Sequence, residues 1–159
     1  MIPLTLITVG TLKESYLREA VAEYEKRLSA YCRVDTVQLK EHRLPENPSE
    51  SEIRTALAEE GRRILAAIPP RAYSIALCVE GRQMSSPALA RHLESALQNG
   101  APLCLVIGSS HGLSEEVKAA CRFRLSVSEL TFPHQLMRVL LLEILYRSFS
   151  ILHGSRYHK

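Results

Sequence analysis

Apolar and polar positions along the chain switch repeatedly between the period of a strand and the period of a helix. Short runs rich in β-branched residues predict strands at residues 4–9, 34–39, 73–79, 103–107 and 123–127. Between them, apolar residues three or four positions apart predict helices at 14–29, from 49 to before Pro69, from 86 to 98, after Ser114, and at 133–151. Strands that alternate with helices indicate an α/β fold with substantial parallel pairing.

Helix boundaries are marked by local signals. Ser49 with Glu52 three residues later is a capping box, in which each residue satisfies a free backbone group of the other. Ser86 is expected to be an N-cap with Pro87 as the first helical residue. Pro133 suits the first helical position in the same way, since its missing N–H group costs nothing there.

The helix expected at 133–151 dominates the last third of the chain. At 1.5 Å per residue it is roughly 28 Å long, and its polar residues are few: Arg138, Glu143, Arg147 and Ser150. Because so many of its residues are apolar, we expect this helix to be covered by other structure on two sides, as at a subunit interface. The charged residues interrupt any membrane-spanning window, so no membrane is expected. A core helix of a monomer, followed by an inert basic tail at 154–159, is the alternative.

Composition sets broad limits. The 159 residues fit one domain, 1–159, and contents of 46% hydrophobic and 23% charged residues are ordinary for a globular protein. The N-terminus has no basic region typical of a signal peptide. The cysteines Cys32, Cys78, Cys104 and Cys121 are scattered, which favours reduced thiols. A cytoplasmic location is therefore expected.

Charge is unevenly distributed. The net charge is only +3, but residues 122–159 carry six Lys or Arg against two Glu. Three histidines, His134, His153 and His158, lie in the same segment. A local basic surface is typical of a phosphate-facing protein, although this excess alone does not establish a nucleic-acid partner.

Candidate ligand-binding segments follow three of the expected strands, at 77–81, 107–112 and 127–132. Ligands of parallel α/β sheets bind beyond the carboxyl ends of strands. Gly108 and Gly112 allow the backbone to approach a ligand closely, because glycine has no Cβ; the alternative is that both are ordinary turn glycines.

Two other chemistries have weak sequence support. Residues 108–112 also match G-x-S-x-G between a strand and a helix, which makes Ser110 a candidate hydrolase nucleophile with Glu129 or Glu143 and His134 or His153 as partners. No His or Cys pair has the spacing of a metal site, so no metal is expected.

Several motifs together carry a resemblance to a known family. They are Leu4–Gly10, Tyr24–Ser29, Leu77–Gly81, Ile107–Leu113, Leu130–His134 with Arg138 and Val139, Glu143, Tyr146–Arg147 and Tyr157–His158. In these positions the sequence resembles the RlmH (YbeA-type) family of the SPOUT methyltransferase superfamily, which methylates N3 of a pseudouridine in 23S ribosomal RNA. The resemblance implies an α/β knot with a C-terminal trefoil knot, a homodimer, and S-adenosylmethionine as the cofactor.

The same resemblance implies site residues. Cofactor contacts are expected from Leu77, Gly108, Val127, Ser128, Glu129, Leu130, Thr131 and Phe132. Arg147 and Tyr157 are expected to bind and orient the RNA base, and His158 either to act as a general base or to contact a phosphate. Simple docking of the tail is the alternative reading of these three residues.

The chain departs from the family pattern at two positions. The first loop usually contains Leu-Asp, where this chain has Cys78, and the second usually has a Gly-Gly pair, where this chain has Ser109. We expect the Cβ of Ser109 to crowd the methionine end of the cofactor. The alternative function is therefore a catalytically inactive dimer that binds RNA or the ribosome.

Overall fold

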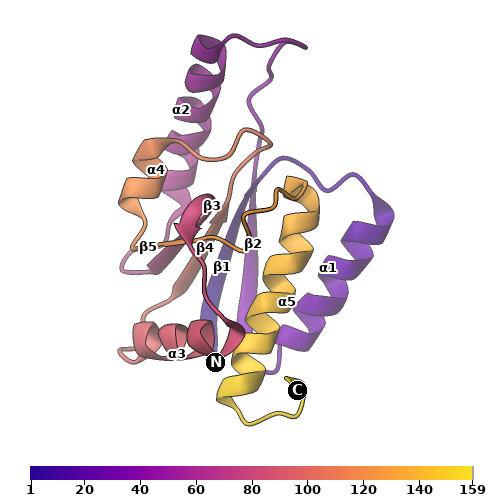
Figure 1. The fold of residues 1–159 in the computed structure, drawn as a ribbon, viewed down its shortest axis with the longest axis vertical. Coiled ribbons are helices and arrows are strands. Elements are labelled where there is room, and N and C mark those ends of the chain that lie inside the picture. The colour runs from indigo at the N-terminus through magenta and orange to yellow at the C-terminus, as the bar shows by residue number, and fades with distance from the viewer. Residues whose placement is uncertain (159) are drawn as a thin grey trace.

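Five parallel strands form one sheet, in the order β2-β1-β4-β3-β5 (Figure 1). The computed structural model describes residues 1–158. The strands are β1 (Ile2–Val9), β2 (Cys32–Leu39), β3 (Tyr73–Arg82), β4 (Leu103–Ile107) and β5 (Phe123–Leu125). The helices are α1 (Ser15–Leu28), α2 (Glu50–Ala67), α3 (Ser86–Leu97), α4 (Glu115–Ala120) and α5 (His134–Leu152). The expected parallel α/β fold is thus confirmed, whereas the C-terminal trefoil knot stays a prediction.

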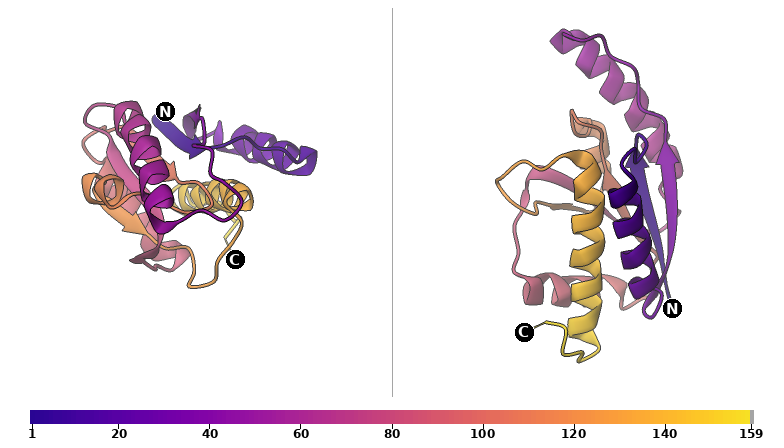
Figure 2. Two further views of the ribbon diagram at one scale, coloured as in Figure 1. Left: turned by 90° about the horizontal axis from the view of Figure 1, so that it is seen from above. Right: turned by 90° about the vertical axis from the view of Figure 1, so that its right-hand side faces the viewer.

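Helices cover both faces of the sheet, because side chains of a strand alternate between its two sides. In β4, Leu103 and Leu105 join the core formed with α1, α3 and α5, whereas Cys104 and Val106 join the core formed with α2 and α4. The result is three layers with the sheet in the middle (Figure 2). All five β4 residues are buried, as the continuous apolar run predicted.

Helix α5 packs beside α1 and α3 on one face of the sheet. Leu141, Leu145 and Phe149 on its inner side are almost completely buried. Cover of a second side by another subunit stays a prediction. Leu136, Leu140 and Ile151 share another side of the helix, are only half-buried, and belong to neither core cluster. These three residues, the outer stripe of α5, leave apolar surface available to a partner.

Arg138 links α5 to the end of β1. Its buried guanidinium donates hydrogen bonds to the carbonyl oxygens of Val9 at 3.1 Å and Gly10 at 2.6 Å. Burial lowers the pKa of Arg138, and the nearby charge of Glu41 acts in the opposite direction. The first strand and the last helix of the described chain are therefore fastened together at the carboxyl edge of the sheet.

Several boundaries differ from the sequence predictions. Ser85, not Ser86, caps α3, because its hydroxyl accepts a hydrogen bond from the Ala88 N–H group at 3.3 Å. Pro133 is the N-cap of α5 rather than its first helical residue, with extended backbone at ψ 136°. Strand β3 continues three residues further than expected, to Arg82, while β5 ends two residues early. The capping box of Ser49 and Glu52 is present as predicted.

Cys32, Cys104 and Cys121 are buried, and Cys78 is partly exposed; all four thiols are free. Within residues 1–158, no helix is long and apolar enough to cross a membrane. Lys159, the last residue of the basic tail, lies outside the described residues.

Candidate active site

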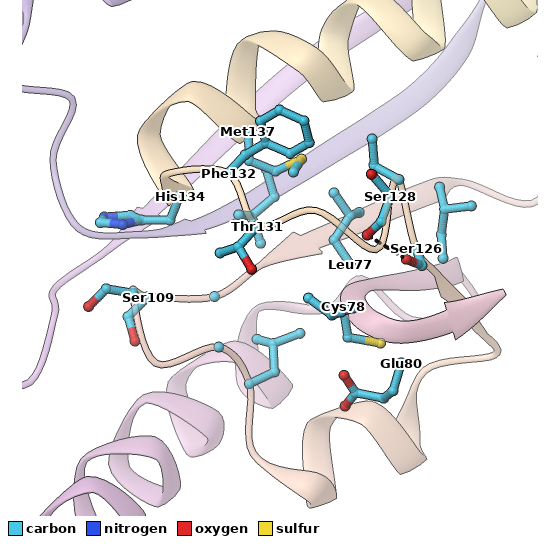
Figure 3. A pocket seen from close by; sticks show the side chains of 18 of the residues that line it. Leu77, Cys78, Glu80, Ser109, Ser126, Ser128, Thr131, Phe132, His134 and Met137 are labelled. Atoms are coloured by element: carbon cyan, nitrogen blue, oxygen red, sulfur yellow. Dashed lines mark hydrogen bonds between the residues drawn. The ribbon is translucent and has the colours of Figure 1, made fainter. Parts of the chain in front are cut away.

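A cavity of about 790 Å³ opens at the carboxyl ends of β3, β4 and β5 (Figure 3). This is within the usual size range of small-molecule pockets. The three segments predicted from the sequence meet there, and α5 contributes its first turn. Of the expected cofactor residues, those that line the cavity are Leu77, Gly108, Val127, Ser128, Leu130, Thr131 and Phe132. Glu129 is exposed and is not part of the lining.

The loop after β4 forms one wall, and it is tight. The Gly112 N–H group donates to the Ser109 carbonyl oxygen at 2.9 Å, and Gly112 has a φ of +85°. A Cβ on Gly108 would lie 2.2 Å from the Gly112 carbonyl oxygen and 2.9 Å from Leu113 Cδ2. Only glycine fits at position 108, so the loop folds back on itself there and leaves backbone facing the cavity.

Ser109 is part of the cavity lining, but its hydroxyl does not point into the cavity. The expected crowding of the cofactor by its Cβ stays a prediction. The side chain turns into the protein, where Oγ donates a hydrogen bond to Oε1 of Glu60 at 3.0 Å, and the residue is only 6% exposed. Glu60 is 3% exposed, and its Oε2 accepts the His42 N–H group at 3.0 Å. One buried carboxylate on α2 therefore fixes the loops that follow β4 and β2. Sequence reasoning missed Glu60, because a single Glu on an otherwise amphipathic helix carries no signal.

Replacing Glu60 with alanine is expected to lower the free energy of unfolding by about 2 kcal/mol, because two buried donors would lose their acceptor. Urea unfolding followed by circular dichroism measures this change. Glu59→Ala is the matched control on the same helix, since Glu59 makes only a surface ion pair with Arg62 and should cost less than about 0.5 kcal/mol. Equal effects for the two variants would contradict the role assigned to Glu60.

The end of β3 brings charge to the cavity. Lys118 of α4 pairs with Glu80 and, at 2.6 Å, with Glu115. The hydrogen bond from Lys118 lowers the pKa of Glu80, so this carboxylate is charged at neutral pH and can accept hydrogen bonds from hydroxyl or ammonium groups. Burial raises the pKa of Cys78. Sequence analysis considered only Cys78 at the position of the missing acid, although Glu80 lies two residues later in the same lining.

The segment between β5 and α5 is held by its own polar groups. Ser126 Oγ donates to the Ser128 carbonyl oxygen at 3.2 Å, and Ser128 Oγ accepts the Leu130 N–H group at 3.0 Å (Figure 3). Leu130 is 72% exposed at the rim of the cavity. The wall thus presents backbone and small side chains, which suits recognition through main-chain hydrogen bonds.

The three expected catalytic residues meet around Glu143 in the tail cluster, which consists of Glu143, Arg147, Tyr157 and His158. Arg147 donates to Glu143 Oε1 through Nε at 2.9 Å and Nη2 at 2.5 Å, and Tyr157 donates to Oε2 at 2.8 Å. The Arg147 guanidinium lies 4.7 Å from the Tyr157 ring centre, and its Nη1 is 3.5 Å from His158 Nδ1. The hydrogen bond to Glu143 raises the pKa of Tyr157, which therefore stays protonated at neutral pH.

The tail cluster and the cavity lie toward opposite ends of α5. His134 lines the cavity, and nine residues at about 1.5 Å each place Glu143 roughly 14 Å further along the helix. Figure 2 shows the loop before α5 at one end of this helix and the chain after it at the other. None of the four residues of the tail cluster lines the cavity of the same chain.

A serine hydrolase has no geometric support. Ser110 is exposed and makes no hydrogen bond to any histidine of residues 1–158. His153 is at the other end of α5, where its Nδ1 lies 2.8 Å from the Phe149 carbonyl oxygen. A nucleophile needs a base within hydrogen-bond reach, which Ser110 lacks. In the described part of the chain, no group of three or more His, Cys, Asp or Glu side chains forms a metal site.

Open parallel α/β sheets bind their ligands beyond the carboxyl ends of the strands, which is where this backbone-lined pocket lies. A family model with the description "Predicted SPOUT methyltransferase" matches residues 2–158. The chain belongs to this SPOUT methyltransferase family. The expected cofactor, S-adenosylmethionine, is confirmed at the level of the family.

Solved structures share the fold at low sequence identity. A probable methylase family protein from Haemophilus influenzae is 14% identical, with a TM-score of 0.55 and coverage of 100% of this chain and 72% of that chain. A putative methylase family protein from Neisseria gonorrhoeae is 16% identical, with a TM-score of 0.51 and coverage of 91% and 82%. These likenesses show that this chain has the fold of those proteins.

Proposed function

We propose that the chain is a cytoplasmic, homodimeric methyltransferase that uses S-adenosylmethionine to methylate N3 of a pseudouridine in 23S ribosomal RNA on the assembled ribosome. The observation that carries the proposal is the backbone-lined cavity closed by Gly108, in a chain that matches the family over residues 2–158. The family motifs at Leu130–His134 and at Tyr157–His158 support the particular substrate.

The residues present fit the cofactor. Gly108 allows its loop to fold tightly, so that loop backbone lines the cavity, and the segment 127–132 provides main-chain donors and acceptors for an adenine. Glu80 is placed to accept a hydrogen bond from a hydroxyl or ammonium group. When bound, S-adenosylmethionine supplies an electrophilic methyl group on its sulfonium.

The tail cluster suits the acceptor base. The imide N3–H must lose its proton before the nitrogen can accept a methyl group, and the charge of Arg147 would favour the resulting anion. Tyr157 is held by Glu143 with its ring beside Arg147, so it would orient the base rather than accept a proton. His158 would take the N3 proton or contact a phosphate, since an imidazole can serve as a base or as a hydrogen-bond donor.

A second copy of the chain would bring a tail cluster close to the cavity. The outer stripe of α5, Leu136, Leu140 and Ile151, lies on the same side of the helix as Arg147. If this stripe packs against its equivalent in a twofold dimer, the tail cluster of one protomer approaches the cavity of its partner. Homodimer formation would then be a requirement of the active site.

Calorimetric titration with S-adenosylmethionine and S-adenosylhomocysteine tests the cofactor, and methylation of pseudouridine-containing ribosomes lacking this mark tests the reaction. Saturable binding followed by methyl transfer to N3 is the expected result. No binding at millimolar ligand would overturn the proposal in favour of an inactive dimer that binds RNA. That alternative is motivated by the departure of the 108–112 loop from the family pattern.

A further inference from the structure

A second cavity, of about 730 Å³, lies next to the first. It is formed by the loops that follow β1 and β2, with the tip of the loop after β4 as its border. Ser110 and His111 line both cavities, so the two are continuous at the carboxyl edge of the sheet. Neither the cofactor segments nor the tail cluster include the other residues of this second cavity.

The second cavity is basic. Lys13, Lys40 and Arg43 line it and are exposed, and none of the three forms an ion pair within the described residues 1–158. His42 and His111 add two further groups that can donate hydrogen bonds. Together, Lys13, Lys40, Arg43, His42 and His111 are named the basic groove.

The one acid in this lining, Glu41, does not cancel these charges. Its carboxylate lies near the end of β1, where Oε2 is 3.2 Å from the position of a Cβ on Gly10. One acid against three exposed cations leaves this lining with an excess of positive charge.

The loops that carry the groove are held in place. Arg138 fixes the carbonyl groups of Val9 and Gly10, and the buried Glu60 holds the His42 N–H group on one side and Ser109 on the other. Arg63 donates to the Lys40 carbonyl oxygen at 2.9 Å. The carboxylate of Glu60 thus connects the basic groove to the loop that begins at Gly108. The fold therefore fixes the distance between the basic groove and the first cavity.

We infer that the basic groove binds the phosphodiester backbone of the RNA strand beside the nucleotide that is methylated. This inference rests on the proposed function. It specifies the surface of one protomer along which the RNA strand would lie. An RNA strand entering the cofactor cavity at the shared border of Ser110 and His111 would continue along Lys13 on one side and Lys40 and Arg43 on the other. Flexible, exposed cations suit a polyanion, since phosphate contacts position a strand without reading its sequence.

The test compares Lys40→Ala/Arg43→Ala and Lys13→Ala with the wild-type protein, using 70S ribosomes that lack the methyl mark. Affinity is measured across salt concentrations, together with KM and kcat for methyl transfer and calorimetric binding of S-adenosylmethionine. The slope of log affinity against log salt is expected to fall by about one unit for each cation removed. KM for ribosomes should rise, while cofactor affinity and kcat at saturation stay unchanged.

Arg33→Ala/Arg91→Ala is the matched control. Both arginines are exposed and make no ion pair within residues 1–158, and they lie on β2 and α3, outside both cavities. This variant loses the same charge as Lys40→Ala/Arg43→Ala but should keep the wild-type slope and KM. An equal loss in both double variants would overturn the inference, since net charge alone would then explain binding.

The remaining outcomes separate the inference from the proposed function. Wild-type protein that neither binds nor methylates ribosomes overturns both. Wild-type protein that methylates ribosomes, with groove variants of unchanged KM and salt dependence, overturns the inference alone. Groove variants that lose affinity for ribosomes but keep it for a protein-free fragment of 23S RNA would assign the groove to a ribosomal protein and so also overturn the inference.

Discussion

Replacing Gly108 with alanine is expected to weaken binding of S-adenosylmethionine by about a hundredfold. The added Cβ would lie 2.2 Å from the Gly112 carbonyl oxygen and 2.6 Å from its carbonyl carbon, which are backbone atoms that no rotamer change can move. The loop must open instead. Overpacking of this kind costs about 1–3 kcal/mol, and 2.7 kcal/mol corresponds to a hundredfold loss.

Gly112→Ala is the matched control for this variant, because it changes the same loop without a collision. No atom lies within 4 Å of the added Cβ, although the φ of +85° puts alanine under backbone strain. A cost of about 1 kcal/mol in stability and less than a tenfold loss of affinity are expected. Calorimetry measures affinity, and circular dichroism verifies folding. Wild-type affinity in Gly108→Ala would contradict the assignment of this loop as a cofactor wall.

Replacing Arg147 with alanine should lower methyl transfer by about 10²–10³-fold, while binding of S-adenosylmethionine and the dimer persist. The guanidinium is the positive group of the tail cluster, and its loss leaves Glu143 unpaired next to the place where the base would become an anion. Single-turnover rates with ribosomes measure the effect. Arg147→Lys should recover only part of the activity, since an ammonium cannot reproduce the two hydrogen bonds from Nε and Nη2.

Arg156→Ala provides the control for Arg147→Ala. Arg156 is exposed in the same tail and makes no hydrogen bond or ion pair from its side chain within residues 1–158, so its loss should leave the rate within a few-fold of the wild type. Loss of the dimer in Arg147→Ala would show an architectural role instead of a role in methyl transfer. An unchanged rate would remove Arg147 from the active site.

Mixing the two inactive variants tests whether tail and cavity act between protomers. A mixed dimer of Gly108→Ala and Arg147→Ala has one intact pair, namely the tail of the first variant and the cavity of the second. Equal mixing with subunit exchange should therefore recover about one quarter of the wild-type activity, because half of the dimers are mixed and each has one working site of two. No recovery after demonstrated exchange would mean that tail and cavity act within one chain.

The parallel fold was predictable because each strand carries its own signal. Residues 103–107 are a continuous apolar run, and the structure buries all of them between two helical layers. The strand ends that form the cofactor cavity followed from a general rule for parallel sheets. Boundaries were less accurate: Ser85 and Ser86 are equally suitable caps by type, and only the backbone conformation of Ser85 selects it.

Other features depend on contacts far apart in the sequence and were not predictable. Glu60 and Ser109 are 49 residues apart, so nothing local indicated that the hydroxyl would turn toward α2. The tail cluster was identified by motif resemblance alone. Its hub, Glu143, was a motif position without a role in methyl transfer until the structure placed Arg147 and Tyr157 on its two oxygens. The basic groove combines residues from three loops that are far apart in the sequence. None of these loops alone has an excess of basic residues like that of residues 122–159.

The contact of Arg138 with the end of β1 also constrains the order in which the protein folds. The hydrogen bond to Val9 joins residues 129 positions apart, and β1 occupies the inside of the sheet between β2 and β4. Non-local contacts of this kind slow folding, because a long loop must close before they contribute. During synthesis, the face of β1 that carries Leu4 and Leu6 lacks the cover of α5 until this helix has been made, so a ribosome-bound precursor should be sensitive to protease until then and should become resistant in one late step.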